Sequence, residues 1–252
     1  MYIDVLKEKL AKKEKIFASI LSEARMTGLP AVYKRNGVDF IVLDLEHGMF
    51  FPENIGEFAG MCNAVELPVI VRVQDCEYHC ISKPLDMGAD GVLIPRTESF
   101  EQVETAIQSM RFAPYGKKGC GGRALLRKGE DVYDFNKNRL LFLQIESKEG
   151  TDLLDAILTK YGDQVAGIII GPYDMAVSMG CGFNLDADEM IENITKTIRI
   201  CEKHGKSIGM FMEDDKVAQR WHKEGMNIFW IGSEVTILSA ELNRLRNRVD
   251  EF

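Results

Sequence analysis

Apolar segments of strand length alternate with segments of helical pattern, and this alternation repeats eight times along the 252 residues. Strands that alternate with helices form parallel sheets, and eight such units close into a barrel. The sequence therefore predicts an α/β protein of one domain, a (β/α)8 TIM barrel over residues 1–252, without a linker or second domain. The predicted strands cover 16–21, 40–47, 68–73, 90–95, 140–147, 165–171, 206–212 and 227–232.

The predicted helices follow from amphipathic spacing and from capping residues. One helix, over about 3–14, precedes the first strand, and another, over about 234–248, follows the last. Between them we expect helices over 22–37, 52–65, 77–88, 151–160, 186–204 and 214–224, and one that begins after Ser99.

Composition excludes several classes of protein. The net charge is −8 and there is no basic run, which argues against a nucleic acid partner. No window reaches the ~18 consecutive apolar residues of a membrane span, and the first residues lack the apolar stretch of a signal peptide. Six scattered cysteines without a C-x-x-C pair indicate reduced thiols and a cytoplasmic protein. A metal site at Cys76, His79 and Cys80 is disfavoured, because such local patterns are seldom ligand sets.

Polar residues gather where the predicted strands end. Barrel enzymes keep their chemistry at the C-terminal ends of the strands, so we expect these side chains to lie on one rim. They are Asp44, Glu46, His47, Arg72, Gln144, Glu146 and the segment Gly171 to Asp174.

Glu146 and Asp174 each follow one of two consecutive strands. Hard divalent cations bind through one or two carboxylates and leave the other positions to water and substrate. The pair therefore predicts a site for Mg²⁺ or Mn²⁺, with Co²⁺ or Zn²⁺ as alternatives.

The other rim residues suit chemistry beside such a cation. A metal that polarises a keto oxygen, with Arg72 as a fixed positive charge, would stabilise an enolate. His47, oriented by Asp44, would move a proton, and backbone N–H groups at Gly171 to Asp174 would hold a carboxylate. This outlines an enolate-forming carbon–carbon lyase. A Schiff-base mechanism is disfavoured, because no predicted strand ends in Lys.

Each of these residues also has a structural interpretation. Arg72 alone would be a rim salt bridge, for instance to Glu46, and His47 alone would be a hydrogen-bonded packing residue. Asp174 alone would be a helix N-cap before Met175. Only their expected position on one rim favours the functional interpretation.

Seven segments, taken together, resemble a known family from about residue 15 to 245. They are FIVLDLEHG, VIVRV, LDMGADGVLIPR, RFAPYGKKGCGGRA, LFLQIESKEG, IIIGPYDMAVSMG and IFWIGSE. The chain resembles the metal-dependent pyruvate aldolases of the HpcH/HpaI aldolase/citrate lyase family, which act on 4-hydroxy-2-oxoheptanedioate, 2-keto-3-deoxy-L-rhamnonate or 2-dehydro-3-deoxyglucarate. The resemblance implies a barrel of the phosphoenolpyruvate/pyruvate type and a reaction that joins pyruvate and an aldehyde, or the reverse.

The resemblance also implies roles for individual residues. Glu146 and Asp174 would be the metal ligands, Arg72 would contact the keto oxygen, and His47 with Asp44 would transfer protons through water. Substrate would be held by Gln144, Gly171, Tyr173 and Asp174, the last three through the backbone. Asp86 would reach the site of a neighbouring subunit, in a hexamer built as a trimer of dimers that exchange their last helix.

The chain departs from the family pattern at two of these positions, because Tyr173 replaces a usually small residue and Glu234 stands where Asp is common. Tyr173 and the Gly-rich loop around Arg123 leave the aldehyde half of the substrate open. Two other interpretations stay open. The first is an acyl-CoA lyase of the citryl- or malyl-CoA type, which uses the same metal–enolate chemistry. The second is a barrel retained as a non-catalytic binding module.

Overall fold

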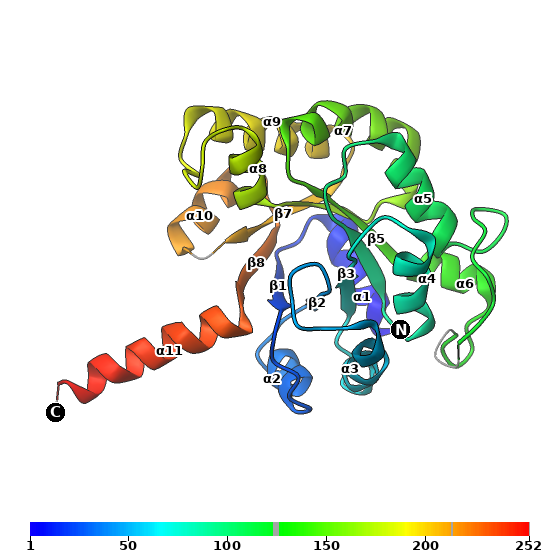
Figure 1. Cartoon of the computed structure of the whole chain (residues 1–252), viewed down its shortest axis with the longest axis horizontal. Helices are drawn as coiled ribbons and strands as arrows, with labels where there is room; N and C mark the ends of the chain where they lie inside the picture. Colours follow the sequence, from blue (N-terminus) through cyan, green and yellow to red (C-terminus); the bar gives the residue numbers. More distant parts are fainter. Residues whose placement is uncertain (123–125, 213, 252) are drawn as a thin grey trace.

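The computed structural model describes residues 1–122, 126–212 and 214–251. Parallel strands form a closed barrel in chain order, β1 to β8, which confirms the predicted TIM barrel (Figure 1). Both faces of the strands are covered, as is usual for parallel sheets, and this explains their almost continuous apolar runs. The strands are β1 (Ile16–Leu21), β2 (Phe40–Asp44), β3 (Val69–Arg72), β4 (Gly91–Ile94), β5 (Leu140–Ile145), β6 (Gly167–Ile170), β7 (Ser207–Met212) and β8 (Ile228–Ser233).

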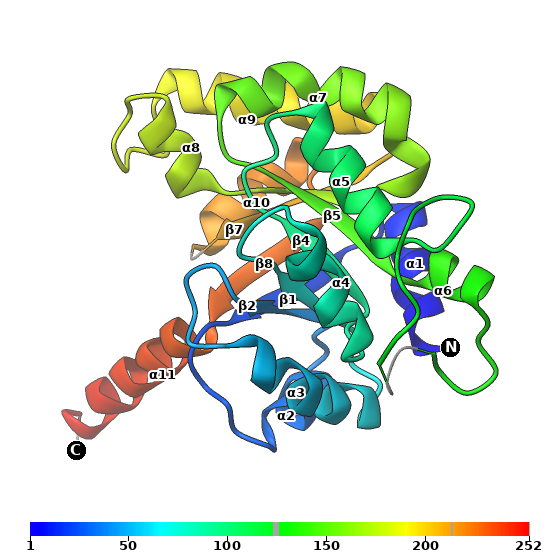
Figure 2. The same cartoon turned by 45° about the vertical axis from the view of Figure 1, so that its right-hand side comes forward.

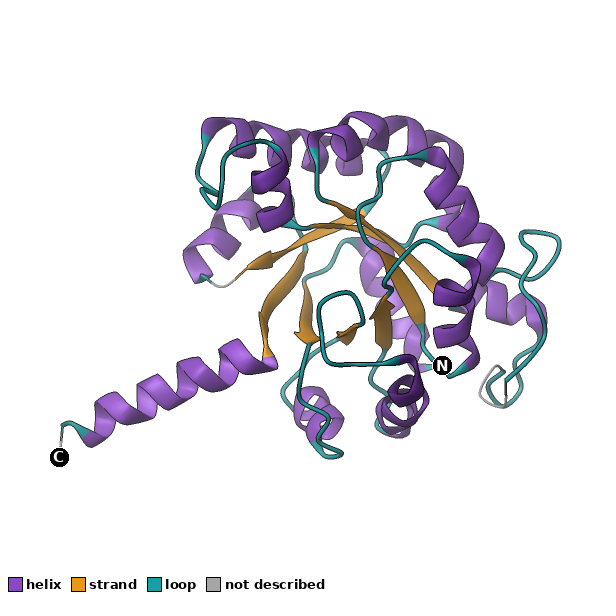
Figure 3. Ribbon diagram, viewed as in Figure 1, coloured by secondary structure: helices purple, strands orange, loops and turns teal. Residues whose placement is uncertain are grey.

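Most of the helices surround the barrel on its outer face, as Figure 3 shows in purple around the orange strands, whereas the first and the last do not. They are α1 (Tyr2–Lys12), α2 (Leu29–Arg35), α3 (Pro52–Ala64), α4 (Tyr78–Asp86), α5 (Phe100–Met110), α6 (Val132–Asn138), α7 (Lys148–Tyr161), the 3-10 turn η1 (Gly162–Gln164), α8 (Pro172–Ser178), α9 (Asp188–Lys203), α10 (Asp215–Lys223) and α11 (Glu234–Val249). No helix in the described ranges is long and apolar enough to cross a membrane.

The buried side chains form two clusters. The larger cluster lies between the strands and the surrounding helices. The smaller one fills the barrel interior, where Phe40 and Phe142 stack with ring centroids 5.6 Å apart. Leu6 and Leu10 of α1 belong to the interior cluster, so α1 covers the end of the barrel where the strands begin. The barrel is therefore a packed core that is open to ligands at the opposite end.

The segment 22–37 differs from the prediction. Only Leu29–Arg35 is helical, and Pro30 stands in its first turn. The backbone N–H groups of Ser22, Glu23 and Ala24 instead donate to the carboxylate of Glu234 at 2.5–3.0 Å. A side chain 210 residues away competes successfully for these donors, and local pattern gives no sign of it.

Helix α6 is an element that the sequence pattern did not predict. It occupies seven residues between the Gly-rich loop and β5, and Asp131 caps its N-terminus by accepting hydrogen bonds from Tyr133 and Asp134. A helix this short shows too few turns for a recognisable periodicity.

Helix α11 extends away from the barrel as an isolated rod in both Figure 1 and Figure 2. Its apolar side chains are exposed, with Leu238 60% and Leu242 57% accessible. Within the described residues nothing covers this face of the helix.

Candidate active site

A cavity of about 270 Å³ opens at the C-terminal ends of the strands. Seven strands or the loops that follow them contribute to it, as expected for a barrel of this kind. Its lining residues are Ile20, Ser22, Asp44, His47, Arg72, Gln144, Glu146, Gly171, Pro172, Tyr173, Asp174, Phe211, Trp230 and Ser233. Nearly all residues that the sequence analysis selected are thus in one place, and Glu46 and Asp86 are outside this lining.

Arg72 is held by two carboxylates. Asp44 and Arg72 are register partners at the ends of β2 and β3. Arg72 Nε donates to Asp44 Oδ1 at 2.9 Å and Nη2 donates to Oδ2 at 2.7 Å, while Nη1 lies 3.3 Å from Glu46 Oε2. Burial by itself would lower the pKa of Arg72, but the bonds and charge of Asp44 raise it further than burial lowers it. The guanidinium is therefore a fixed, permanently charged group at the cavity.

Glu146 is nearly sealed from solvent, with 2% of the residue exposed. Its Oε1 accepts a hydrogen bond from Gln144 Nε2 at 2.7 Å, and its Oε2 accepts one from the backbone N–H of Arg96 at 2.9 Å. Burial raises the pKa of Glu146 to about 7, against the lowering effect of the Arg96 N–H, and the charges of Glu46 and Asp174 add to the rise. A cation beside this carboxylate would relieve the cost of its charge.

Gly171 is needed here for space and not for backbone freedom. Its φ is −93°, which any residue adopts, but a Cβ would lie 2.2 Å from Glu146 Oε1 and 2.9 Å from Gln144 Nε2. The N–H of Gly171 donates to the carbonyl of Ile145 at 3.1 Å. Of the expected backbone donors to a substrate carboxylate, the one at Gly171 is therefore already used within the barrel.

Asp174 lies within the first turn of α8 and is not its N-cap, which is Gly171. Pro172 occupies the first helical position, where a missing N–H costs nothing. An N-cap role for Asp174 would require the helix to begin at Met175, but it begins at Pro172. Asp174 lines the cavity instead.

His47 lies in the loop after β2, because that strand ends at Asp44 and not at 47. Its side chain is 65% exposed, and Nε2 is 3.9 Å from Glu46 Oε1. Asp44 accepts from the backbone N–H of His47 at 3.3 Å, while its carboxylate is otherwise engaged by Arg72. The expected pairing of Asp44 with the imidazole is thus replaced by pairing with the guanidinium.

Asp86 lies at the end of α4, away from the cavity of its own chain. Lys118 Nζ donates to Asp86 Oδ1 at 2.5 Å, and the Lys118 side chain is fully buried. Gly122, with a φ of +82°, packs against the backbone of Asp86. The Gly-rich loop thus closes over Asp86, and Arg123 of that loop lies outside the described residues. A role of Asp86 in a neighbouring subunit stays a prediction.

Aromatic side chains form the other half of the cavity. Tyr173 was expected at the site, whereas Phe211 and Trp230 were not identified from the sequence. Trp230 of β8 contacts Phe211 of β7 with ring centroids 6.2 Å apart, and Phe211 is 6.4 Å from Tyr173. Tyr173 in turn contacts Phe183 at 6.2 Å. Phe211 and Trp230 stand within apolar strands and resemble core residues in the sequence, so only their place on β7 and β8 marks them.

Glu146 and Asp174 are the carboxylates suited to a cation. Over the described ranges, no cluster of three or more His, Cys, Asp or Glu side chains is arranged to bind a metal. That absence includes the segment with Cys76, His79 and Cys80. Two carboxylates and one amide nevertheless suffice for Mg²⁺, which keeps several waters. The Oε1 of Gln144 is buried without a hydrogen-bond partner, so a polar group at this point of the cavity would satisfy it.

Comparisons with known proteins agree with the fold and with the motifs. The family model of the HpcH/HpaI aldolase/citrate lyase family matches residues 22–240. A hydroxypyruvate/pyruvate aldolase from Roseovarius nubinhibens is 31% identical over 209 residues, which are 81% of this chain and 80% of that protein. A 5-keto-4-deoxy-D-glucarate aldolase from Escherichia coli is 31% identical over 216 residues, 83% of this chain and 82% of the other.

Solved structures show the same barrel. The HpcH/HpaI aldolase from Desulfitobacterium hafniense superposes with a TM-score of 0.89 at 22% identity, over 98% of this chain and 97% of that chain. Since a family model matches most of the chain and the aldolase relatives exceed 30% identity, the protein belongs to the HpcH/HpaI aldolase/citrate lyase family.

Proposed function

We propose that the protein is a divalent-metal-dependent aldolase that cleaves or forms 4-hydroxy-2-oxo acids, with pyruvate as one product or substrate and an aldehyde as the other. The observation that carries this proposal is the convergence of Arg72, Glu146 and Asp174 on one cavity. The activities for which the relatives are named, those of a hydroxypyruvate/pyruvate aldolase and a 5-keto-4-deoxy-D-glucarate aldolase, support the same class of substrate.

Glu146 and Asp174 would hold the cation, and Gln144 would orient Glu146 through the 2.7 Å hydrogen bond. When bound, a divalent cation would act as a Lewis acid on the keto oxygen of the substrate. The raised pKa of Glu146 and the unsatisfied Oε1 of Gln144 both fit a site completed by such a group.

Arg72 would supply the fixed positive charge. In cleavage the bond between C3 and C4 breaks, its electron pair stays with C3, and negative charge spreads to the keto oxygen. The guanidinium cannot turn away from that oxygen, because Asp44 holds Nε and Nη2. A preorganised charge of this kind needs no rearrangement during the reaction.

A proton leaves the C4 hydroxyl as the aldehyde forms, and a proton is returned to C3 to give pyruvate. His47 is the candidate for this transfer, because it lines the cavity and its exposed ring also meets solvent. Glu46 is near both His47 and Arg72, and burial raises its pKa. Glu46 would therefore take part in the proton transfer together with His47.

The aromatic side of the cavity would receive the aldehyde. The same cavity is lined by charged groups and by Tyr173, Phe211 and Trp230. The carboxylate and keto groups of the substrate would contact the charged groups and face away from the aromatic side chains. We expect the enzyme to accept aldehydes with an apolar or aromatic substituent, because an aromatic surface offers few hydrogen-bond partners to a polar substituent.

We also propose that the protein is a homo-oligomer in which α11 packs on another copy. The exposed apolar residues of α11 support this, because an uncovered apolar face of this kind marks an interface. The family resemblance favours a hexamer built from dimers. All six cysteines are free thiols, which fits a reducing compartment such as the cytoplasm.

The experiment that tests the function is a screen of pyruvate against a panel of aldehydes, with and without Mg²⁺ or Mn²⁺, that measures carbon–carbon bond formation. Metal-dependent product that disappears with EDTA would support the proposal. Cleavage of citryl- or malyl-CoA without any aldol activity would replace it with the acyl-CoA lyase. No reaction with either class would leave the binding module as the interpretation.

A further inference from the structure

A second and larger cavity, of about 680 Å³, lies at the opposite end of the barrel. It is bordered by α1, α6, η1 and the segments in which β5, β6 and β7 begin. This size is typical of sites for small molecules. The cavity is thus separated from the candidate active site by the packed interior of the barrel.

Basic side chains outnumber acidic ones in the lining of this cavity. Lys7, Arg111, Lys137, Arg139 and Lys206 line it, and Asp163 is the one acidic residue among the lining residues that the structure describes. Arg139 is already neutralised by Glu130, to which its Nη1 and Nη2 donate at 2.9 and 2.8 Å. The remaining basic groups give the cavity a positive charge in a protein whose net charge is −8.

Arg111 is the most informative of these residues, because only 5% of it is exposed. Its Nε donates to Gln164 Oε1 at 3.3 Å and its Nη1 donates to the carbonyl of Arg139 at 2.7 Å, and both acceptors are neutral. Among the described residues no carboxylate forms an ion pair with it. Burial, with the charge of Arg139, lowers the pKa of Arg111 to about 10, so it still carries its charge at neutral pH. Buried charges are normally paired, and within residues 1–122, 126–212 and 214–251 this one has no carboxylate partner.

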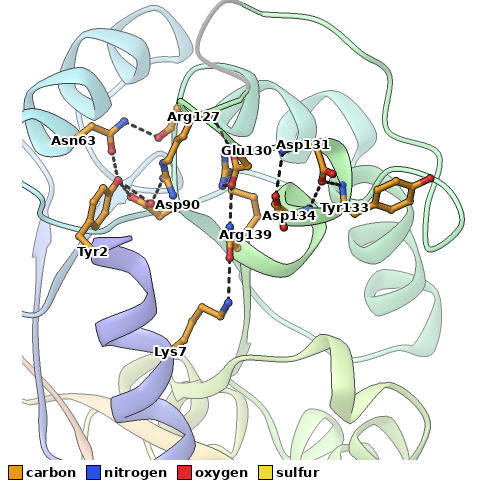
Figure 4. A network of polar contacts seen from close by, with 12 residues as sticks. Tyr2, Lys7, Asn63, Asp90, Arg127, Glu130, Asp131, Tyr133, Asp134 and Arg139 are labelled. Carbon is orange, nitrogen blue, oxygen red and sulfur yellow. Dashed lines mark hydrogen bonds and ion pairs between the residues drawn. The ribbon is translucent and has the colours of Figure 1, made fainter.

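Lys206 and Lys7 extend the positive surface from two other elements. Lys206 is half-buried, which lowers its pKa, and its Nζ donates to the carbonyl of Val165 at 3.0 Å. Lys7 reaches from α1 toward the segment before β5, where its Nζ donates to Asn138 Oδ1 at 3.1 Å, and Figure 4 shows this approach beside Arg139. The ammonium group of Lys206 is bound to a neutral oxygen, as Arg111 is, and retains its positive charge toward the cavity. The ammonium group of Lys7 also lies 3.7 Å from Oδ1 of the exposed Asp4, which offsets part of its charge.

The network in Figure 4 holds this end of the chain in place. Tyr2 donates to Asn63 Oδ1 at 2.5 Å and to Asp90 Oδ1 at 3.0 Å, and Arg127 pairs with Asp90. These contacts attach α1 and the loop before α6 to the bottom of β4. Helix α1, which borders the cavity, is therefore anchored to the barrel by contacts outside the cavity lining.

We propose that this cavity binds a small polyanion, a metabolite that carries phosphate or several carboxylates. Arg111 would make the central contact, since a guanidinium matches the two oxygens of either group. Lys206 and Lys7 would contact the remaining oxygens, and the exposed Lys137 would attract the ligand at the entrance.

The test is equilibrium dialysis of the intact protein against inorganic phosphate and, separately, propane-1,2,3-tricarboxylate, which distinguishes the two sources of negative charge. We expect saturable binding of one of them, one molecule per chain. Arg111→Met and Lys206→Gln should each weaken it by about 10- to 100-fold, as expected for a lost charge-assisted bond. Lys137→Ala should give a smaller loss that disappears at high salt, because that side chain is exposed.

Two further variants make the result decisive. Lys216→Ala removes the same charge from an exposed position on α10, outside the cavity lining, and should bind as the wild type does. Arg72→Ala alters the candidate active site and should also leave this binding unchanged, so failure of the proposed function would not affect the result. Absence of saturable binding of both anions would overturn the proposal. So would loss of binding in Arg72→Ala, or wild-type affinity in a folded Lys206→Gln.

Discussion

Arg72 and Asp44 face each other across β2 and β3, and the guanidinium donates two hydrogen bonds to the two oxygens of one carboxylate. The pair is almost completely buried, with 8% of Arg72 and 2% of Asp44 exposed. A two-bond pair of this kind fixes the plane of the guanidinium, which a single surface ion pair does not. The third nitrogen of the guanidinium, Nη1, does not bind Asp44 and lies 3.3 Å from Glu46 Oε2.

Arg72→Ala should lower kcat for aldol cleavage roughly 10²- to 10³-fold, equivalent to about 3–4 kcal/mol, because a preorganised donor acts on charge that develops during the reaction. Arg72→Lys should recover only part of the rate, since Lys lacks the planar fork that Asp44 holds. The measurements are kcat for cleavage and proton exchange of pyruvate in D₂O.

Arg220→Lys is the matched control, because Arg220 forms an exposed ion pair with Asp186 on the outside of the protein. It should leave both rates unchanged. Near-normal rates in Arg72→Ala in both assays would show that Arg72 is structural and that the proposed mechanism is wrong.

Gly171→Ala should disable the site while keeping the fold. The new Cβ would lie 2.2 Å from Glu146 Oε1, so the carboxylate would have to move. A displacement of about 1 Å in a reacting group costs about 10² in rate. Steady-state kcat/KM should fall accordingly, and the affinity for Mn²⁺, measured by calorimetry, should fall with it.

Gly60→Ala provides the comparison, because a Cβ at this exposed position of α3 meets nothing within 4 Å. It should raise the free energy of unfolding by roughly 0.5–1 kcal/mol and leave the activity unchanged. Unchanged activity and Mn²⁺ affinity in Gly171→Ala would contradict the assigned role of Glu146.

Glu146→Gln should change how stability depends on pH in the metal-free protein. Because the folded pKa of Glu146 is raised to about 7, the native state holds this proton more tightly than the unfolded chain does. The associated stability is fully present below the unfolded pKa and is lost as pH rises through the folded value. The variant should therefore match the wild type near pH 4 and exceed it by up to about 3 kcal/mol above pH 7.

Denaturant unfolding across this pH range, in the presence of EDTA, gives the comparison. The same substitution at an exposed position, Glu149→Gln, is the control. Its free energy of unfolding should follow that of the wild type at every pH. Addition of Mn²⁺ at pH 8 should stabilise the wild type and not Glu146→Gln, because only the former keeps both ligands. A difference between Glu146→Gln and wild type that does not vary with pH would refute the assignment.

Substitution of the apolar face of α11 should dissociate the oligomer. Leu238 and Leu242 are one helical turn apart and exposed, so Leu238→Glu combined with Leu242→Glu places two charges within the proposed interface. Light scattering should report a smaller species than for the wild type. Asn243→Glu adds a charge on another side of the same helix and should leave the mass unchanged. A monomeric wild type at micromolar concentration would exclude the oligomer.

The barrel and much of its rim could be predicted from the sequence because the signals are local. Each strand is a short apolar run, and a polar group after such a run must lie at the end of a strand. Arg72, Gln144, Glu146 and Asp174 are predicted on one rim by this rule, and all four line one cavity. The short helix α6 and the true start of α2 were not predicted, because one is too brief to show a period and the other depends on Glu234.

Pairings between side chains depended on the tertiary structure. Asp44 and His47 are neighbours in the sequence, yet the carboxylate of Asp44 pairs with Arg72, because strand register places those two residues side by side. Trp230 and Phe211 have the sequence pattern of core residues. They line the cavity because closure of the barrel brings β7 and β8 beside the other strands. Likewise, Arg111 is an ordinary charge in the sequence, and it is set apart only by its burial without a carboxylate partner in the part of the chain that the structure describes. Sequence determined which elements form and where they end, since those depend on local periodicity. Three-dimensional packing decided which groups meet, because contacts between distant residues depend on strand register and barrel closure.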